Sequence, residues 1–430
     1  MRKPFIFLLF FIAGLNATAQ HYILDSILQV HGQIIHTEHN TFAYADSSHS
    51  FRIFFGKLDS LYEGHQKNIQ IFHIGGSHIQ ADIYSNKVRE YLRNITPHTH
   101  SSRGLVFPYR LAGTNNPLNY SITGNRDMWK GYRSPLSRDT AAWGLGGIAA
   151  TLAGNEDTIH IKANRVVQVK SPYTFNKIRL FAVSDSSGYS ITSAATSQVF
   201  TGILFNPAKG YCEISFPDTI KEAGLVIRKN DTSAQAYFSI TGMELLNDFP
   251  GIIYNSIGVN GASFKSYNRC TLFQEQLQLF KPDLFIISIG TNDAAAKDFD
   301  PENYRYYYDS LIRTVKSVNP ECAILLTVPN DSYYRKKHPN RNTELQQQLI
   351  HELARKHHQA VWDFYAVMGG MGSSQRWYNR KLMVHDRVHF TAAGYSVKGD
   401  LLITALIAQW EKTTGREPGS LLKRIKDIHE

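Results

Sequence analysis

Hydrophobic and polar residues follow two different patterns along this chain of 430 residues. In residues 51–107, and again after residue 251, apolar residues at helical spacing separate short segments that are apolar throughout. From about residue 109 to 246, short alternating segments are separated by Asn, Asp, Gly, Ser and Pro. The first pattern is typical of a parallel sheet covered by helices on both faces, and the second of a β-sandwich.

The two α/β regions predict alternating strands and helices. The expected strands, which are largely apolar, are 68–74, 251–257, 283–289, 323–328 and 360–364. The expected helices, in which apolar residues recur three and four positions apart, are 51–62, 79–94, 263–280, 304–318, 343–357 and 391–410. In the middle region, the alternation typical of strands occurs at 158–162, 177–183 and 224–228.

These patterns predict one doubly wound α/β domain with an inserted all-β sandwich or jelly-roll domain. We expect the α/β domain to be divided between residues 20–108 and 248–412, with the insert at 109–247. Residues 413–430 are polar and rich in Lys and Arg, and are expected to form a surface tail.

The N-terminus has the features of a secretory signal peptide. Arg2 and Lys3 precede an unbroken apolar segment at 5–15, and small residues at 17–19 form a cleavage site. The apolar segment is shorter than the about 20 residues that a membrane-spanning helix needs. We expect residues 1–19 to be removed and the protein to be secreted or periplasmic; a retained anchor helix is the alternative.

The formal net charge is +10, and the basic residues are spread along the chain. A mild excess of positive charge favours anionic surfaces such as a cell-wall polymer. No nucleic-acid recognition motif accompanies it, so we expect no nucleic-acid partner.

The cysteines and histidines give little sign of a structural bridge or a metal. Cys212, Cys270 and Cys322 are too few for a disulfide framework, and we expect all three to be free. One disulfide between the first two is the alternative. The histidine pairs at 98–100 and 357–358 have no acidic residue at ligand spacing, so neither a metal nor an organic cofactor is expected.

Ser77 follows the strand expected at 68–74 through Gly75 and Gly76. In an α/β fold this turn lies at the carboxyl end of the sheet, where ligands bind. Glycines allow a tight turn from which a serine hydroxyl projects, so Ser77 is a candidate nucleophile. A helix N-cap serine is the alternative. We do not expect His78 to be its base, because adjacent side chains seldom face each other.

Asp386 and His389 stand three residues apart near the C-terminus. On a tight turn this spacing brings the carboxylate within hydrogen-bond reach of the imidazole N–H. The other ring nitrogen is then free to accept a serine proton. The alternative is a helix-capping Asp and a surface His ahead of the helix expected at 391–410.

Two further residues are candidate hydrogen-bond donors to an oxyanion. Gly261 follows an expected strand and opens the helix expected at 263–280, so we predict its N–H at a helix N-terminus. Asn292 follows the strand expected at 283–289, although a turn-forming asparagine is an alternative. Together with the N–H of Ser77, these groups are expected to form an oxyanion hole.

The sequence contains four short blocks that resemble those of the SGNH (GDSL) hydrolase superfamily. They are Gly-Gly-Ser at 75–77, Gly261, Gly-Thr-Asn-Asp at 290–293 and Asp-Arg-Val-His at 386–389. The resemblance implies a flavodoxin-like parallel sheet. One departure is Gly76, which stands where the family usually has an aspartate.

The resemblance also implies a role for each residue of the site. Ser77 would be the nucleophile and His389 the base, with Asp386 orienting the base. Ser77, Gly261 and Asn292 would form the oxyanion hole. The superfamily needs neither a metal nor a cofactor for this chemistry.

A narrower resemblance is to bacterial peptidoglycan O-acetylesterases that carry an inserted β-sandwich, a carbohydrate-module-like domain. The similar segments are 72–82, 103–108 and 384–395. This resemblance predicts an exported, monomeric serine esterase that removes O-acetyl groups from an acetylated glycan. The expected substrate is peptidoglycan, and the enzyme is expected to associate with the cell wall or envelope. The same triad would also serve a lipase, a thioesterase or a sugar O-acetyltransferase. A glycan-binding wall protein without activity is the alternative from a different class.

Overall fold

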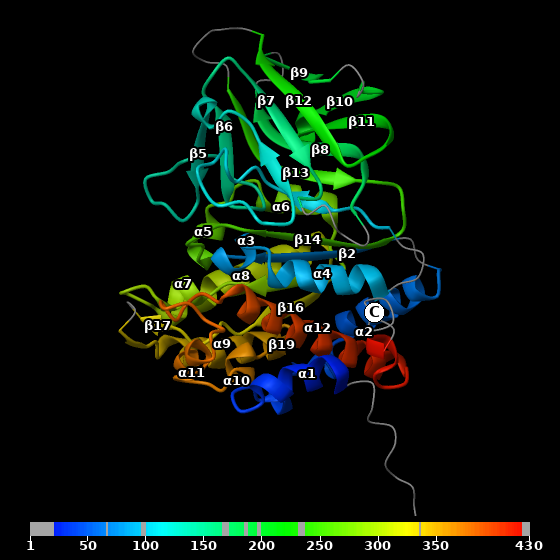
Figure 1. Ribbon diagram of the computed structural model, residues 1–430. Helices are drawn as coiled ribbons and strands as arrows, with labels where there is room; N and C mark the ends of the chain where they lie inside the picture. Colours follow the sequence, from blue (N-terminus) through cyan, green and yellow to red (C-terminus); the bar gives the residue numbers. More distant parts are fainter. Residues whose placement is uncertain are drawn as a thin grey trace, which may run out of the picture.

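The computed structural model describes residues 21–65, 68–95, 100–165, 172–184, 188–195, 199–230, 237–334 and 337–423. The predicted signal peptide lies outside these ranges. Figure 1 shows an α/β domain with a β-sandwich standing on one side of it. Within the described ranges, no helix has the length and apolar character needed to cross a membrane.

The α/β domain is built on a sheet with the strand order β1-β19-β16-β15-β2-β14. Its strands are β1 (Phe42–Ala43), β2 (Asn68–Gly75), β14 (Gly251–Gly258), β15 (Leu284–Ser288), β16 (Ala323–Thr327) and β19 (Ala360–Trp362). All pairs except β1 with β19 are parallel. Numbered along the chain, the parallel strands run 2-1-3-4-5, which is the flavodoxin-like order that the sequence predicts. The antiparallel edge strand β1 was not predicted, because two residues carry no periodic pattern.

Helices cover both faces of this sheet. Those with eight or more residues are α1 (His21–His31), α2 (His49–Tyr62), α4 (Tyr84–Ile95), α6 (Phe273–Phe280), α8 (Pro301–Val318), α9 (Asn342–Lys356) and α12 (Ala392–Thr414). Ile286 of β15 packs in the core with α2, α4 and α12, whereas its neighbours Phe285 and Ile287 pack in the core with α8 and α9. Because side chains alternate along a strand, a sheet buried on both faces needs strands that are apolar throughout.

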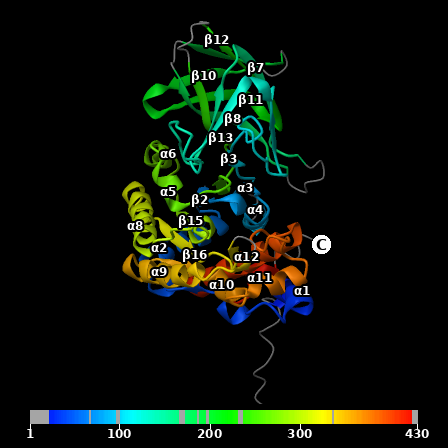
Figure 2. The ribbon, with the colours of Figure 1, turned by 90° about the vertical axis from the view of Figure 1, so that its left-hand side faces the viewer.

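Short elements connect these helices and strands. They are α3 (Ser77–Gln80), α5 (Phe264–Asn268), α7 (Thr291–Ala294), α10 (Phe364–Val367), α11 (Ser373–Asn379), the hairpin β17 (Tyr333–Tyr334) with β18 (His338–Pro339), and four 3-10 turns at Thr37–His39, Ala45–Ser47, Arg126–Met128 and Pro207–Lys209. Figure 2 shows α9, α10 and α11 close together at one side of the α/β domain.

Two helices that the sequence predicts as continuous are broken. The helix expected at 79–94 is divided into α3 and α4, because Asp82 between them has a φ of +44°. The helix expected at 263–280 is divided into α5 and α6. There the N–H of Leu272 donates to the carbonyl of Trp143 in the insert, at 3.0 Å, instead of continuing the helix. In both cases tertiary contacts override the local pattern.

The insert is a sandwich of two antiparallel sheets. The larger has the order β10-β11-β8-β13-β6-β5, with β3 also paired to β13, and the smaller has the order β4-β7-β12-β9. The strands are β3 (Gly104–Val106), β4 (Ser121–Thr123), β5 (Trp129–Arg133), β6 (Ile148–Leu152), β7 (Glu156–Lys162), β8 (Phe175–Ser184), β9 (Tyr189–Ser193), β10 (Gly202–Asn206), β11 (Tyr211–Ile220), β12 (Glu222–Lys229) and β13 (Phe238–Leu246). Strand β3 precedes the predicted boundary at residue 108 but pairs with the sandwich.

The sandwich and the α/β domain share a hydrophobic core. The ring of Phe280 in α6 lies 5.4 Å from that of Phe72 in β2 and 5.8 Å from that of Phe181 in β8. Such aromatic contacts add to the stabilisation gained from apolar burial. The insert is therefore packed against the domain rather than tethered to it.

The described part of the C-terminal segment, residues 413–423, is partly docked in the core, which differs from the surface tail that the sequence predicts. Leu421 and Leu422 are buried in the core formed by α2, α4 and α12. The Glu411 carboxylate accepts hydrogen bonds from the N–H groups of Gly419 and Leu421, both at 2.8 Å. The two leucines are thus enough to pack this otherwise polar segment against the α/β domain. The cysteines, by contrast, are all free and buried, as predicted.

Candidate active site

Ser77 lies just beyond strand β2, at the carboxyl edge of the sheet. Gly75 ends β2, Gly76 follows it, and Ser77 is the first residue of α3. A Cβ atom at Gly75 would lie 2.4 Å from the Ile79 side chain and 2.8 Å from the carbonyl oxygen of Ser288. Glycine is therefore required for the close approach that turns the chain and presents the Ser77 hydroxyl.

The structure brings Ser77, His389 and Asp386 into one hydrogen-bonded chain. The Ser77 Oγ lies 2.9 Å from His389 Nε2, although the two residues are 312 positions apart. The His389 Nδ1 lies 2.8 Å from Asp386 Oδ2. With the Nδ1–H donated to the carboxylate, Nε2 is the nitrogen that accepts the serine proton. The predicted residues therefore have the relative positions that acyl transfer through a serine requires.

The turn that carries Asp386 and His389 is held by its own backbone. Asp386 Oδ1 accepts the N–H groups of Val388, at 2.8 Å, and of His389, at 3.0 Å. Arg387 has a φ of +54°, and the N–H of Val384 closes the loop on the His389 carbonyl at 3.0 Å. Burial alone would raise the pKa of Asp386, but the His389 ring and these two amides outweigh burial and lower it. The carboxylate is therefore charged at neutral pH.

Gly261 and Asn292 lie in the same pocket as Ser77 and His389. The N–H of Ser77, as the first residue of a helix, has no intrahelical acceptor. Gly261 has a φ of +86° and lies in a turn, and its N–H meets no acceptor among the described residues. The prediction that Gly261 opens a helix was wrong, because α5 begins only at Phe264, after the N-cap of Ser263.

The side chain of Asn292 is fixed in the first turn of α7. One N–H of its amide donates to the carbonyl of Ala262 at 2.9 Å, which leaves the second N–H available. A Cβ atom at Gly76 would lie 3.2 Å from Asn292 Nδ2, closer than most side-chain contacts. The glycine at this position therefore lets the amide lie close to the turn of Ser77.

The pocket around Ser77 has a volume of about 560 Å³ and is open to solvent. The loop between β3 and β4 supplies Asn115, Asn116 and the exposed Leu118 to its lining. Asn260 from the turn after β14 also lines it. No sequence pattern singled out these residues, because the sequence around a loop asparagine looks the same whether the side chain shapes a turn or lines a pocket.

Gln80 ties the insert loop to the active-site turns. Its Nε2 donates to the carbonyl of Asn115 at 2.9 Å and to Thr114 Oγ1 at 3.1 Å. Its Oε1 accepts the N–H of Asn260 at 2.7 Å. Gln80 itself is buried. The wall that the insert adds to the pocket is therefore fixed by hydrogen bonds to the α/β domain.

His78 does not reach the Ser77 hydroxyl but stacks on the base. Its ring centroid lies 5.3 Å from that of His389, with an interplanar angle of 21°. Its Nδ1 lies 3.1 Å from the hydroxyl of Tyr395, and the ring of Phe390 packs at its edge. Burial, followed by the nearby Lys398 and His389, lowers the pKa of His78 well below its usual value, so the ring is neutral.

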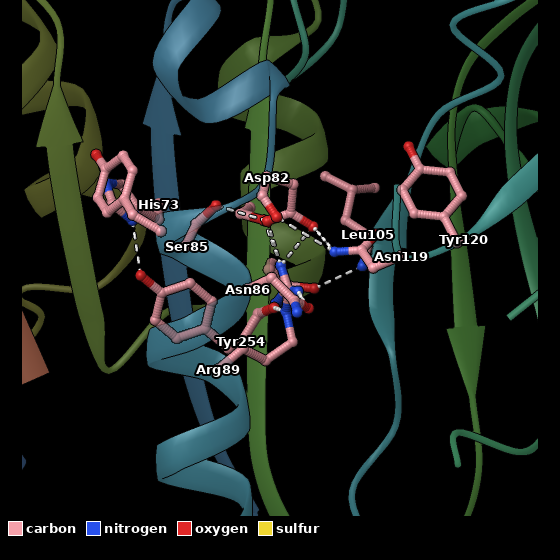
Figure 3. A network of polar contacts seen from close by, with 12 residues as sticks. His73, Asp82, Ser85, Asn86, Arg89, Leu105, Asn119, Tyr120 and Tyr254 are labelled. Carbon is pink, nitrogen blue, oxygen red and sulfur yellow. Dashed lines mark hydrogen bonds and ion pairs between the residues drawn. The ribbon is translucent and has the colours of Figure 1, made fainter. Parts of the chain in front are cut away.

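A buried polar network lies behind α3 and joins the two domains. Asp82, which follows α3, accepts hydrogen bonds from the guanidinium groups of Arg89 at 2.9 Å and Arg103 at 3.0 Å. Asn119 of the insert donates to the same carboxylate at 2.7 Å, as Figure 3 shows. Burial raises the pKa of Asp82, but the two guanidiniums outweigh it and hold the pKa below its usual range. No sequence pattern predicted this network, because its members are dispersed along the chain.

Histidines elsewhere form no metal centre in the described part of the chain. No three His, Cys, Asp or Glu side chains gather there in a way that could hold a metal ion. The His357 ring lies 2.6 Å from the carboxylate of Asp309, so it has a protein partner. His98 lies outside the described residues.

Comparisons with known proteins find a family match that covers Gly261 and the blocks at 290–293 and 386–389, but not the block at 75–77, and solved structures with a similar fold. Residues 230–397 match the GDSL-like Lipase/Acylhydrolase family. A comparison with curated proteins found no match. Among solved structures, the chain is similar to a peptidoglycan O-acetylesterase, with a TM-score of 0.67 and 21% identity over 84% of this chain and 96% of that chain.

Two further similar structures match only part of this chain. One is a lipase/acylhydrolase from Enterococcus faecalis, with a TM-score of 0.29 and 18% identity over 36% of this chain and 74% of that chain. The other is Axe2, an acetylxylan esterase from Geobacillus stearothermophilus, with a TM-score of 0.30 and 20% identity over 37% of this chain and 75% of that chain. Residues 230–397, which include Gly261, Asn292, Asp386 and His389, are thus similar to the GDSL-like Lipase/Acylhydrolase family, and the chain shares the fold of the peptidoglycan O-acetylesterase.

Proposed function

We propose that this protein is an exported serine esterase that removes O-acetyl groups from a carbohydrate, with peptidoglycan as its substrate. One observation carries the proposal: Ser77 Oγ, His389 and Asp386 form a continuous hydrogen-bonded chain at the edge of an open pocket. This arrangement activates a serine for attack on an ester.

In the proposed reaction, Ser77 Oγ attacks the acetyl carbonyl carbon and its proton passes to His389 Nε2. The charge that develops on the carbonyl oxygen is stabilised by the N–H groups of Ser77 and Gly261 and by the free N–H of Asn292. The C–O bond to the sugar then breaks, and the sugar oxygen takes the proton from His389. Water attacks the acetyl-enzyme with His389 again as base, which releases acetate and restores Ser77.

The lining of the pocket supports a sugar rather than a long acyl chain. Asn115, Asn116 and Asn260 bring amide groups to the pocket, and Gln80 lines it as well. Amides both donate and accept hydrogen bonds, which suits the hydroxyl groups of a carbohydrate. The exposed side chain of Leu118 offers an apolar surface for a sugar ring. A lipase would need a longer apolar groove than this pocket supplies.

A similar solved structure supports peptidoglycan as the substrate, and the predicted signal peptide independently supports export. One solved structure with a similar fold over most of this chain is a peptidoglycan O-acetylesterase. The sequence predicts a signal peptide at residues 1–19, which would bring the enzyme to the cell wall. We therefore propose a monomeric enzyme that acts on acetylated peptidoglycan in the periplasm or outside the cell.

The central test is the variant Ser77→Ala with Ser137→Ala, an exposed serine of the insert, as its matched control. Both would be assayed with 4-nitrophenyl acetate, acetylated peptidoglycan and acetylated xylan by measuring released acetate. We expect Ser77→Ala to lose hydrolysis of all esters and the control to retain it. Unchanged turnover in Ser77→Ala would exclude the proposed mechanism.

Two further measurements separate the proposal from its alternatives. Covalent labelling of the wild type, but not of Ser77→Ala, by a serine-reactive phosphonate would contradict a binding protein without activity. If an added sugar acceptor received acetyl groups faster than water did, the enzyme would be a transferase rather than an esterase.

A further inference from the structure

A second pocket, of about 690 Å³, lies beside the candidate active site. Ala296 lines it and is only four residues after Asn292, beyond the single turn of α7. The hairpin of β17 and β18 contributes to another wall, and its residue Tyr333 donates its N–H to the carbonyl of Arg387 at 3.1 Å. Arg387 belongs to the turn of Asp386. The pocket therefore adjoins both the candidate oxyanion residue and the loop of the base.

The charged residues that line this pocket are all basic or potentially basic. They are Lys297, His338 and Arg341, and all three side chains are exposed. None of the described residues in the lining carries a carboxylate. Neither Lys297 nor Arg341 forms an ion pair with another described residue. Arg341 also stands at the N-cap of α9, where the helix dipole adds positive potential.

The side chain of Asn340 has a buried hydrogen-bond donor that meets no acceptor among the described residues. The residue lines the pocket but is only 3% exposed. Its Oδ1 accepts the N–H of Asn342 at 3.2 Å, which fixes Nδ2 as the donor end of the amide. Among the described residues Nδ2 has no hydrogen-bond partner. A buried donor without an acceptor is energetically unfavourable, and a bound acceptor group removes that cost.

We infer that this pocket is a subsite for a carboxylate carried by the glycan substrate. Two exposed cations, a titratable imidazole and an unpaired amide donor together form a set that recognises an anion with several acceptor oxygens. The inference rests on the proposed function and narrows its substrate class: the acetyl ester would lie at Ser77 while a carboxylate of the same glycan lies against Lys297 and Arg341. The carboxylate belongs either to an acidic sugar or to a peptide attached to the glycan.

The test uses the double variant Lys297→Gln, Arg341→Gln in the full-length protein. Its matched control is Lys162→Gln, Arg228→Gln, which removes two exposed cations from the sandwich and changes the net charge equally. Four substrates would be compared: 4-nitrophenyl acetate, an acetylated peptidoglycan disaccharide with its free sugar carboxylate, the same disaccharide with that carboxylate converted to a methyl amide, and the disaccharide with its peptide attached.

We expect the pocket variant to lower kcat/KM for the carboxylate disaccharide about 10-fold, mainly through KM, because two cation contacts are lost. Turnover of 4-nitrophenyl acetate and of the methyl amide should stay at the wild-type level, which also shows that the variant is folded. Raising the salt concentration should weaken only the wild-type preference for the acid. If only the peptide-bearing substrate responds, the carboxylate is that of the peptide.

Equal rates for the acid and the methyl amide in the wild type, together with no effect of the peptide, would overturn the inference. So would an equal loss in the pocket variant and its control. A binding experiment tests the subsite without any turnover. Calorimetry would measure the affinity of Ser77→Ala protein for the carboxylate disaccharide, with and without the two pocket substitutions. Failure of the proposed esterase is therefore distinguishable from failure of the subsite.

Discussion

Replacing Asp82 by Asn tests whether the buried network in Figure 3 holds the two domains together. The carboxylate lies between Arg89 and Arg103, whose side chains are each 1% exposed, and it is itself 4% exposed. Asp82→Asn keeps the shape of the side chain and an acceptor oxygen but removes the negative charge that pairs with the two buried guanidiniums. Within the described part of the chain, these two arginines form no ion pair with another acid.

The magnitude follows from this burial. Removing one partner of a buried ion pair costs about 3–5 kcal/mol, because the remaining charge stays in a poorly solvated site. We expect Asp82→Asn to lower the free energy of unfolding by about 4 kcal/mol, which for a chain of this length corresponds to a fall in Tm of about 5 °C. Adding Arg103→Met should recover part of the loss, because a single unpaired guanidinium then remains.

The assay is thermal unfolding followed by circular dichroism, with Asp46→Asn as the control. Asp46 pairs with Lys412 at the surface, where the two side chains are 59% and 66% exposed, so the loss of this pair should cost less than 1 kcal/mol.

The pKa of Asp82 is lowered in the folded state. Its contribution to stability is therefore present above its unfolded pKa of about 4 and is lost only as the pH falls through the lower folded value. The difference between wild type and variant should therefore be constant from pH 8 to pH 5. An effect of Asp82→Asn no larger than that of the surface control would refute the reasoning.

Three other predictions concern the site and its surroundings. Asn292→Ala should lower kcat for 4-nitrophenyl acetate on the order of 10²–10³-fold with little change in KM, whereas near-normal kcat would remove its amide from the oxyanion hole. His78→Ala should lower kcat, because the ring stacked on His389 is lost, and His78→Phe should restore most of the activity; equal defects in both variants would argue against the stack. Burial raises the pKa of Asp293 to about 7, so between pH 4 and pH 7 the folded state keeps a proton that the unfolded state releases, and stability falls as the pH rises through this window. Asp293→Asn should flatten this dependence of Tm on pH, and an unchanged slope would contradict the assignment.

The positions of the strands and of the candidate nucleophile were predictable because they rest on local patterns. Five apolar segments became the parallel strands, and the glycine turn after β2 presented Ser77 as expected. The pair of Asp386 and His389 was also predictable, since three residues on a tight turn can meet without help from the rest of the fold. The breaks in two expected helices were not predictable, because distant partners caused them.

The sequence by itself determined the class of fold, the turn that carries Ser77 and the bond between Asp386 and His389, because each depends on residues that are close along the chain. Only the tertiary structure decided that His389 meets Ser77 across 312 positions and that the insert loop supplies Asn115 to the pocket. It also decided the place of Asp82, whose partners come from separate elements. Contacts between distant segments depend on how sheet, helices and insert pack together, and no local pattern encodes that packing.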